Sequence, residues 1–206
     1  MRSIVSDVSP PEPAEARRLT LDEWADLPED EEGELVDGVL VEEEMGGVAH
    51  EAVVAWLIAT IRAWLPHRAG RVLGSEVKLA VAPHRGRKPD LLAWFPGHPP
   101  LPRHGLVRVP PDLVIEVIAL RPRDHRRDRI EKAREYAAFG VRWYWLVDPE
   151  ARTFEILERG EDGRFTVALA ASEGRLDIIP GCEGLTIDLD DLWAEIDDLA
   201  DASEDH

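Results

Sequence analysis

Two acidic residues, Asp90 and Glu116, lie beside and within apolar runs of the sequence. Asp90 follows Pro89 and directly precedes LLAWF, and Glu116 interrupts LVIEVIAL. An ionised carboxylate inside an apolar strand is costly unless a partner charge, a metal ion or the edge of a site compensates it. If the two segments are paired strands, both carboxylates converge on one hard cation. Mg²⁺ suits such a pair, because it takes oxygen ligands, keeps several waters and can activate an attacking water on a phosphate.

Lys132 is the candidate for a third group, one that stabilises developing negative charge or orients a water molecule. It lies on a predicted helix that follows the Glu116 run and can return over the end of that strand. The alternative is an exposed ion pair with Asp128, four residues earlier on the same helix, which would contribute little.

The two carboxylates also have structural interpretations, and the sequence leaves the choice open. Asp90 can cap a turn after Pro89, since Asp commonly bonds to nearby backbone groups in turns. Glu116 needs some partner, and either Lys78 or Arg121 can supply it.

The charge distribution sets the segment around these residues apart. The chain has a formal net charge of -18, which argues against a generic nucleic-acid binder, because phosphate contacts need positive charge. Residues 84–134 nevertheless hold 12 Lys and Arg against 6 Asp and Glu, a balance of +6, so the remainder carries -24. This segment indicates either phosphate contacts or a solvated face that pairs with the acidic parts of the chain.

The elements that must position these residues follow from apolar periodicity and turn residues. Thr20 is placed to cap a short helix, and further helices are predicted over 48–66, over 123–140 with Gly140 at its end, and from near Asp188. Strands are predicted at 71–81, 88–95, 112–120 and 141–148, with hairpins over 33–44 and 152–170. Strands clustered around two substantial helices predict an α/β or α+β fold, with helices on the faces of a mixed sheet.

The length of 206 residues suits one domain with a substantial core. We expect a folded domain over residues 19–195, between a flexible N-terminal tail, residues 1–18, and an acidic C-terminal tail, residues 196–206. No apolar run approaches the roughly 20 residues of a membrane helix. The N-terminus also lacks the apolar segment of a signal peptide, so we expect a cytoplasmic protein without membrane contact. The single cysteine, Cys182, excludes an internal disulfide.

Several segments together resemble one known family. They are GELVDG, PDLLAW, PPDLVIEVIA, RRDRIEKAREYAAFGVRWYWLVDP and GLTIDLDDLW, and they resemble the Uma-type restriction endonuclease family, a large bacterial group. The resemblance covers about residues 19–195. Its most specific part is the pattern D-R-x-x-K-x-x-x-Y-x-x-x-G-V-x-x-Y-W-x-V-D, matched from Asp128 to Asp148.

The resemblance implies the restriction-endonuclease-like fold of the PD-(D/E)xK nuclease superfamily, with a mixed central β-sheet flanked by helices. It identifies Asp90 and Glu116 as metal ligands, with the Val117 carbonyl as a third candidate. The superfamily usually has its lysine two residues after the second acid, where this chain has Ile118. Relatives with this gap supply the lysine from the following helix, and Lys132 fits that relocation.

The resemblance also implicates Glu34 and His50, which match polar family positions. Glu34 is a candidate additional ligand, directly or through water, and His50 is a candidate partner of Glu34 or of a phosphate. The chain departs from the family after the Glu116 strand, where relatives commonly have Ser-Pro-Ser and this chain has Ala-Leu-Arg-Pro at 119–122. That loop borders the expected site.

Three functions fit these features. The first is a Mg²⁺-dependent endonuclease acting on DNA, with Mn²⁺ as a substitute metal. The second is a catalytically degenerate nuclease fold that serves as a binding or regulatory protein, and the third is a metal-dependent phosphoesterase with a small substrate. Many nucleases of this fold act as homodimers, and the strand with Trp143 and Trp145 is a candidate interface. In the first function, basic residues contact phosphates: Arg85, Arg87, Lys88, Arg123, Arg126 and Arg127.

Overall fold

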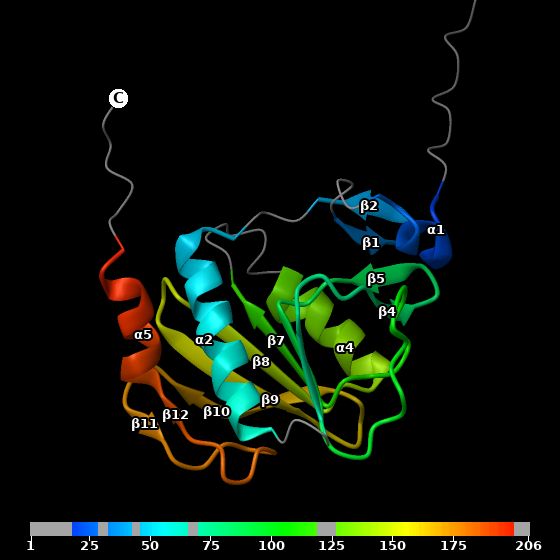
Figure 1. Ribbon diagram of the computed structural model, residues 1–206. Coiled ribbons are helices and arrows are strands. Elements are labelled where there is room, and N and C mark those ends of the chain that lie inside the picture. Colours follow the sequence, from blue (N-terminus) through cyan, green and yellow to red (C-terminus); the bar gives the residue numbers. More distant parts are fainter. Residues whose placement is uncertain (1–17, 29–32, 43–45, 66–69, 119–126, 200–206) are drawn as a thin grey trace, which may run out of the picture.

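The structure is a computed structural model, and it describes residues 18–28, 33–42, 46–65, 70–118 and 127–199 (Figure 1). Its main element is a six-stranded mixed sheet in the order β10-β9-β8-β7-β6-β3. All neighbours are antiparallel except β7 and β8, which are parallel. The strands are β3 (Arg71–Gly74), β6 (Leu91–Trp94), β7 (Leu113–Val117), β8 (Trp143–Asp148), β9 (Thr153–Arg159) and β10 (Phe165–Ala171).

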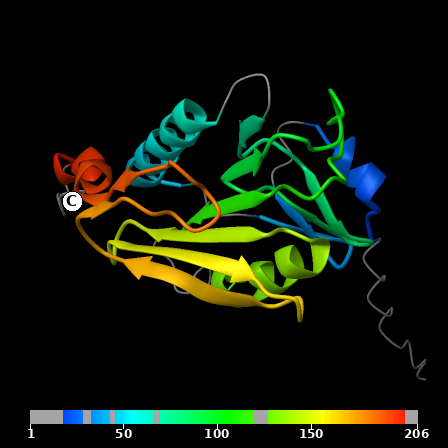
Figure 2. The same ribbon diagram turned by 90° about the horizontal axis from the view of Figure 1, so that it is seen from below.

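Helices cover both faces of this sheet (Figure 2). One face packs against α2 (Val48–Trp64) and α5 (Leu189–Asp197), and the other packs against α4 (Ala133–Phe139), which follows a π-helical turn, η1 (Arg127–Lys132). Parallel strands need a long crossover connection, and η1 with α4 lies in the crossover between β7 and β8. The expected mixed sheet with helices on its faces is therefore confirmed.

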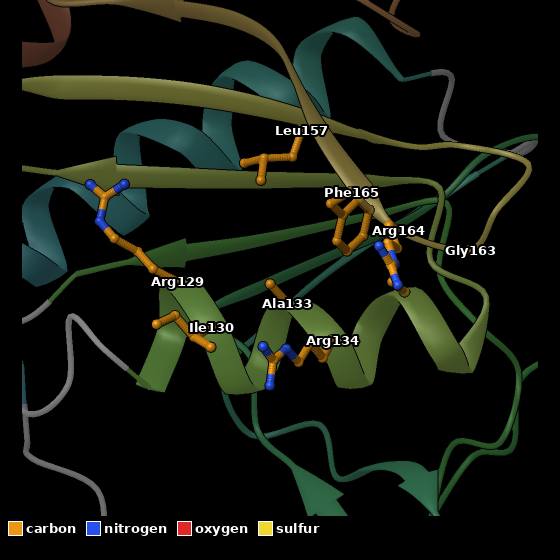
Figure 3. Close-up of a pocket in the computed structure, with 9 residues that line it drawn as sticks. Arg129, Ile130, Ala133, Arg134, Leu157, Gly163, Arg164 and Phe165 are labelled. Atoms are coloured by element: carbon orange, nitrogen blue, oxygen red, sulfur yellow. The ribbon is translucent and has the colours of Figure 1, made fainter.

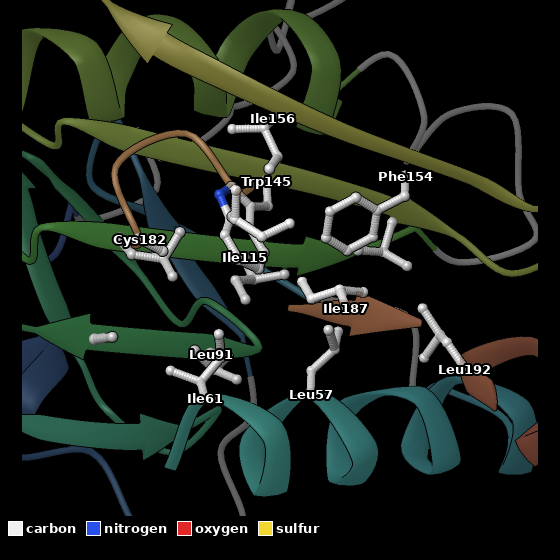
Figure 4. Packing of buried hydrophobic residues seen from close by; sticks show 14 of the residues in the cluster. Leu57, Ile61, Leu91, Ile115, Trp145, Phe154, Ile156, Cys182, Ile187 and Leu192 are labelled. Atoms are coloured by element: carbon white, nitrogen blue, oxygen red, sulfur yellow. The ribbon is translucent and has the colours of Figure 1, made fainter. Parts of the chain in front are cut away.

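The buried residues divide by strand alternation into two cores. Odd-numbered residues of β7, such as Ile115, join α2 and α5, together with Trp145 of β8 and Phe154 of β9 (Figure 4). Even-numbered residues, such as Val114, face α4. Successive side chains of a strand point to opposite faces, so Glu116 lies on the α4 side, where Lys132 can reach it.

A smaller four-stranded sheet stands beside the main one, in the order β2-β1-β5-β4. The hairpin of β1 and β2 turns at Asp37 and Gly38, as predicted, and both residues have positive φ. The short helix α1 packs on this sheet through Trp24, and Thr20 caps the helix in a capping box with Glu23. The elements are α1 (Leu21–Ala25), β1 (Glu34–Val36), β2 (Val39–Val41), β4 (Leu79–Ala82) and β5 (Arg85–Arg87).

The structure corrects several sequence-based predictions. The strand predicted over 71–81 is two strands, β3 and β4, that belong to different sheets. β5 was not predicted, nor was the short pair β11 (Arg175–Leu176) and β12 (Ile187–Asp188). Trp143 and Trp145, a candidate interface, are 6% and 0% exposed and belong to the core.

Two further features bear on the expected properties of the chain. Cys182 is buried, and burial raises the pKa of its thiol to about 12. Among the helices of the described residues, none combines the length and the apolar character that crossing a membrane requires.

Candidate active site

Asp90 and Glu116 are brought together by the pairing of β6 and β7. The two strands are antiparallel with Leu91 opposite Ile115, so Asp90, one residue before β6, stands level with Glu116. The backbone N–H of Val117 donates to Asp90 Oδ2 at 2.7 Å. Asp90 therefore bonds across the sheet and does not cap a turn. Its side chain is 16% exposed, and that of Glu116 is 4% exposed.

Lys132 reaches this pair from the end of η1. Its Nζ lies 3.1 Å from Glu116 Oε1 and 3.5 Å from Glu34 Oε1, and its side chain is 3% exposed. An exposed ion pair on the helix surface is therefore excluded as its role. Lys78, the other proposed partner of Glu116, instead donates to the backbone oxygen of Trp24 at 2.8 Å, and Arg121 lies outside the described residues.

Tyr136 is a site residue that the sequence interpretation missed. Its hydroxyl donates to Glu116 Oε1 at 2.6 Å and is fully buried. Burial and then the charge of Glu116 raise the pKa of Tyr136 well above its usual 10.0, so the hydroxyl stays a donor. The signal was present, because Tyr136 follows Lys132 by four residues and such residues share one helix face.

Glu34 comes to the site from β1 and is completely buried. Arg87 Nη1 donates to its Oε2 at 2.5 Å, and the Lys88 N–H donates to its Oε1 at 3.0 Å. Arg87 is also completely buried and makes two further bonds to Glu135, at 2.7 and 2.9 Å. Together with Lys132, these contacts form a buried network of alternating charges behind Glu116.

The basic residues expected to contact phosphate differ in their positions. Arg87 does not fit that role, because it is 0% exposed and held by two carboxylates. Burial would lower the pKa of Arg87, but Glu135 and Glu34 outweigh burial and raise it, so the residue stays charged. Arg85 is 29% exposed and pairs with Asp37 and Glu135.

Lys88 is 17% exposed at its side chain and pairs with the exposed Glu76 at 3.1 Å. Arg123 and Arg126 lie outside the described residues, as does the side chain of Arg127.

His50, in the first turn of α2, faces Asp90. Its Nε2 lies 3.3 Å from Asp90 Oδ2, and its Nδ1 lies 3.4 Å from Glu51 Oε1. Of the two predicted partners, Glu34 is instead bound by Arg87 and Lys132, and a phosphate contact stays a prediction. Burial lowers the pKa of His50, but the hydrogen bond and charge of Asp90, with Glu51, outweigh burial and raise it above 6.5.

The donor set suits a small hard cation that keeps part of its water shell. Asp90 and Glu116 offer carboxylate oxygens, and Asp90 Oδ1 has no hydrogen bond within the described residues, whereas Oδ2 is engaged. Two carboxylates are sufficient for Mg²⁺, which usually retains several waters. Across the described ranges, no group of three or more His, Cys, Asp or Glu residues is gathered as a ready-made metal cage.

Comparisons with known proteins agree with this architecture. No curated protein matches the chain in sequence. A solved structure, described as "Crystal structure of a putative nuclease belonging to DUF820 from Anabaena variabilis", is similar with a TM-score of 0.69 and 20% identity, over 86% of this chain and 99% of that chain. This likeness supports the restriction-endonuclease-like fold. The family model Uma2, described as "Putative restriction endonuclease", matches residues 19–191, and the chain therefore belongs to the Uma2 family.

Proposed function

We propose that this chain is a metal-dependent endonuclease that hydrolyses phosphodiester bonds in DNA. The proposal is carried by the convergence of Asp90, Glu116 and Lys132, which two paired strands and the following helix bring to one place. Membership of a family described as restriction endonucleases supports nuclease chemistry in general. The acting part would be the domain over residues 19–195.

Asp90 and Glu116 are the proposed ligands of Mg²⁺, or of Mn²⁺ as a substitute, with the Val117 carbonyl as a third. A metal ion held there would supply a bound water of lowered pKa and polarisation of the phosphate. The chain contributes the orientation of both carboxylates. The Val117 N–H and His50 hold Oδ2 of Asp90, and the Tyr136 hydroxyl holds Oε1 of Glu116.

Lys132 is the proposed catalytic cation. Its ammonium group is placed beside Glu116, where it can stabilise the negative charge that develops on the phosphate. Glu34 is 3.5 Å from Lys132 Nζ and bound to Arg87, so we assign it to holding Lys132 and not to direct ligation. This arrangement explains how the chain tolerates Ile118 at the usual position of the lysine.

Phosphate contacts are proposed for the partly exposed Arg85 and Lys88 and for Arg123, Arg126 and Arg127. Pairing of two copies is proposed as well, because β10 lies at the end of the sheet order. An unpaired strand edge is a template for another strand.

The test measures metal binding and cleavage on the same samples. Calorimetry with Mg²⁺ and Mn²⁺ is run on the wild type, Asp90→Asn and Glu116→Gln, followed by nicking of supercoiled plasmid. We expect both variants to lose metal binding and nicking. Asp177→Asn is the matched control, because Asp177 is 72% exposed and pairs with Arg175, and it should behave as the wild type does.

The outcomes separate the competing functions. Metal binding without nicking, combined with turnover of a small phosphoester, would favour the phosphoesterase. An absence of metal binding by the folded wild type would contradict the catalytic site. It would favour a nuclease fold used as a binding module, in which Lys132 permanently neutralises Glu116.

A further inference from the structure

A second concave site lies between the η1–α4 helix and the end of the β9–β10 hairpin (Figure 3). The pocket measures about 680 Å³ and is lined by Arg129, Arg134 and Arg164 together with apolar residues that include Ala133, Leu157 and Phe165. We call it the arginine pocket. Its volume lies within the range of roughly 300–1,000 Å³ that is common for small-molecule sites.

The arginine pocket is separate from the Asp90–Glu116 site. Ala133 lines the pocket, whereas Lys132, the residue before it, turns toward Glu116. Consecutive residues of a helix point in different directions. The two sites therefore use different faces of one helix.

The charge of the arginine pocket is unusual for this chain. Acidic residues outnumber basic ones by 42 to 24, yet Arg134 and Arg164 are exposed and form no ion pair within the described residues. Arg129 alone is paired, with Glu155 at 2.7 Å. Guanidinium groups from a helix and from a hairpin thus border one pocket. Two of them have no carboxylate partner within the described residues. Planar guanidinium forks match phosphate oxygens in geometry and charge.

The wall of the arginine pocket is apolar and partly aromatic. Phe165 is half-buried and fixed against Tyr144, with ring centroids 5.6 Å apart at an interplanar angle of 33°. Leu157 is half-buried beside it, and Ala133 is 8% exposed. Cations at the rim and an aromatic ring in the wall are the two features that recognise a phosphate and a base together.

We propose that the arginine pocket binds a nucleoside phosphate, with Arg134 and Arg164 on the phosphate and Phe165 against the base. The same chemistry is offered by a free nucleotide and by one nucleotide unit of a single strand. Binding at this site does not depend on the proposed nuclease activity, because no metal ligand lines the pocket.

The experiment is calorimetry on the full chain in buffer with EDTA, so that the Asp90–Glu116 site holds no metal. The probes are ATP, a short oligothymidylate and inorganic phosphate. Arg134→Ala and Arg164→Ala each remove hydrogen bonds to a charged phosphate. Each variant should therefore bind ATP or oligothymidylate about tenfold more weakly, or weaker still. Phe165→Leu keeps apolar volume and should weaken ATP binding while leaving inorganic phosphate unchanged.

Two controls keep the result specific. Arg175→Ala removes an exposed arginine that pairs with Asp177 and does not line the arginine pocket. This variant should bind as the wild type does. Asp90→Asn should also bind normally, which separates failure of this proposal from failure of the nuclease proposal. Near-ultraviolet circular dichroism checks that each variant is folded.

The probes decide the source of the ligand. Binding of ATP supports a free nucleotide, and binding of oligothymidylate alone supports a nucleic-acid strand. The proposal is overturned if neither probe binds, if Arg134→Ala and Arg164→Ala bind like the wild type, or if inorganic phosphate binds as tightly as ATP.

Discussion

At the scale of single residues, the candidate site depends on groups that surround the two carboxylates. Oε1 of Glu116 accepts from the Tyr136 hydroxyl at 2.6 Å and lies 3.1 Å from Lys132 Nζ. Both partners are almost completely buried, so neither exchanges its contact for water. The position of Glu116 is therefore set by η1 and α4 as much as by its own strand.

Replacing Tyr136 with Phe tests this dependence. The ring is kept and the hydroxyl is lost, so a buried carboxylate oxygen loses a donor, and we expect the free energy of unfolding to fall by about 1–3 kcal/mol. Plasmid nicking should fall by about tenfold or more, as is usual when a group that orients a metal ligand is removed. Urea unfolding and nicking are measured on the same protein. Unchanged nicking with reduced stability would limit Tyr136 to a structural role.

Arg87 carries the second prediction at this scale. Arg87→Met keeps the apolar stem but leaves the buried Glu34 without its guanidinium partner and removes two bonds from Glu135. Breaking one side of a buried ion pair costs about 3–5 kcal/mol. Urea unfolding should show a loss of that size.

The matched control for Arg87→Met is Arg175→Met. Arg175 is 59% exposed and pairs with the exposed Asp177, and such surface pairs contribute little to stability. Equal losses in the two variants would contradict the buried network.

At the scale of elements, the sequence predicted the strands and helices that carry a strong apolar pattern. β6, β7, β8 and α2 lie within the predicted ranges. The three strands are short and almost entirely apolar runs, and the buried residues of α2 recur at helical spacing. The approach of Asp90 to Glu116 was predicted on the condition that their two strands pair, and β6 and β7 are neighbours in the main sheet.

The sequence did not reveal β5 or the role of Arg87. The segment RGR has no apolar residue. It forms a strand because the β1–β2 hairpin and the helix α1 pack against it. An arginine beside a lysine in the sequence indicates a solvated surface. Arg87 is instead a core residue, because Glu34 and Glu135 from distant elements bind its guanidinium group. The carboxylates that bind Arg87 lie 48 or more positions away in the sequence, so local spacing does not predict this contact.

Gly86 in β5 provides the prediction at the scale of elements. A Cβ at this position would lie 2.1 Å from the ring of the buried Trp24, so Gly86→Ala forces the two apart. Overpacking of this kind costs about 1–3 kcal/mol. Urea unfolding should show that loss, and displacement of β5 should also disturb Arg87 and lower nicking.

Gly74→Ala is the control, because Gly74 lies in β3 and its added Cβ would meet Ile58 at 3.7 Å, an ordinary contact. A similar loss in both variants would mean that strand glycines, and not the contact with Trp24, explain the effect.

At the scale of the whole molecule, β10 forms one edge of the main sheet. β10 has the sequence FTVALAA without a charge, and its Val167 is 60% exposed. Natural sheets usually protect their edges with charged residues. The exposed, uncharged edge therefore predicts antiparallel pairing with the same strand of a second copy.

Sedimentation velocity tests the pairing of two copies. The wild type is expected at twice the chain mass of 23.1 kDa, and Val167→Lys is expected to shift it toward one chain, because an edge lysine opposes strand pairing. Val48→Lys is the control, since Val48 is 72% exposed but lies on α2. A wild type that sediments as one chain at all concentrations would contradict the pairing.

The placement of β7 inside the main sheet has a consequence for synthesis. Glu116 lies on a strand whose neighbour on one side, β8, and the next strand, β9, follow it in the chain, and Lys132 and Tyr136 also follow. A chain leaving the ribosome therefore exposes Asp90 and Glu116 long before it can order them, and long-range pairing of this kind forms late. The proposed site would therefore be complete only when translation has passed the last strand that encloses it.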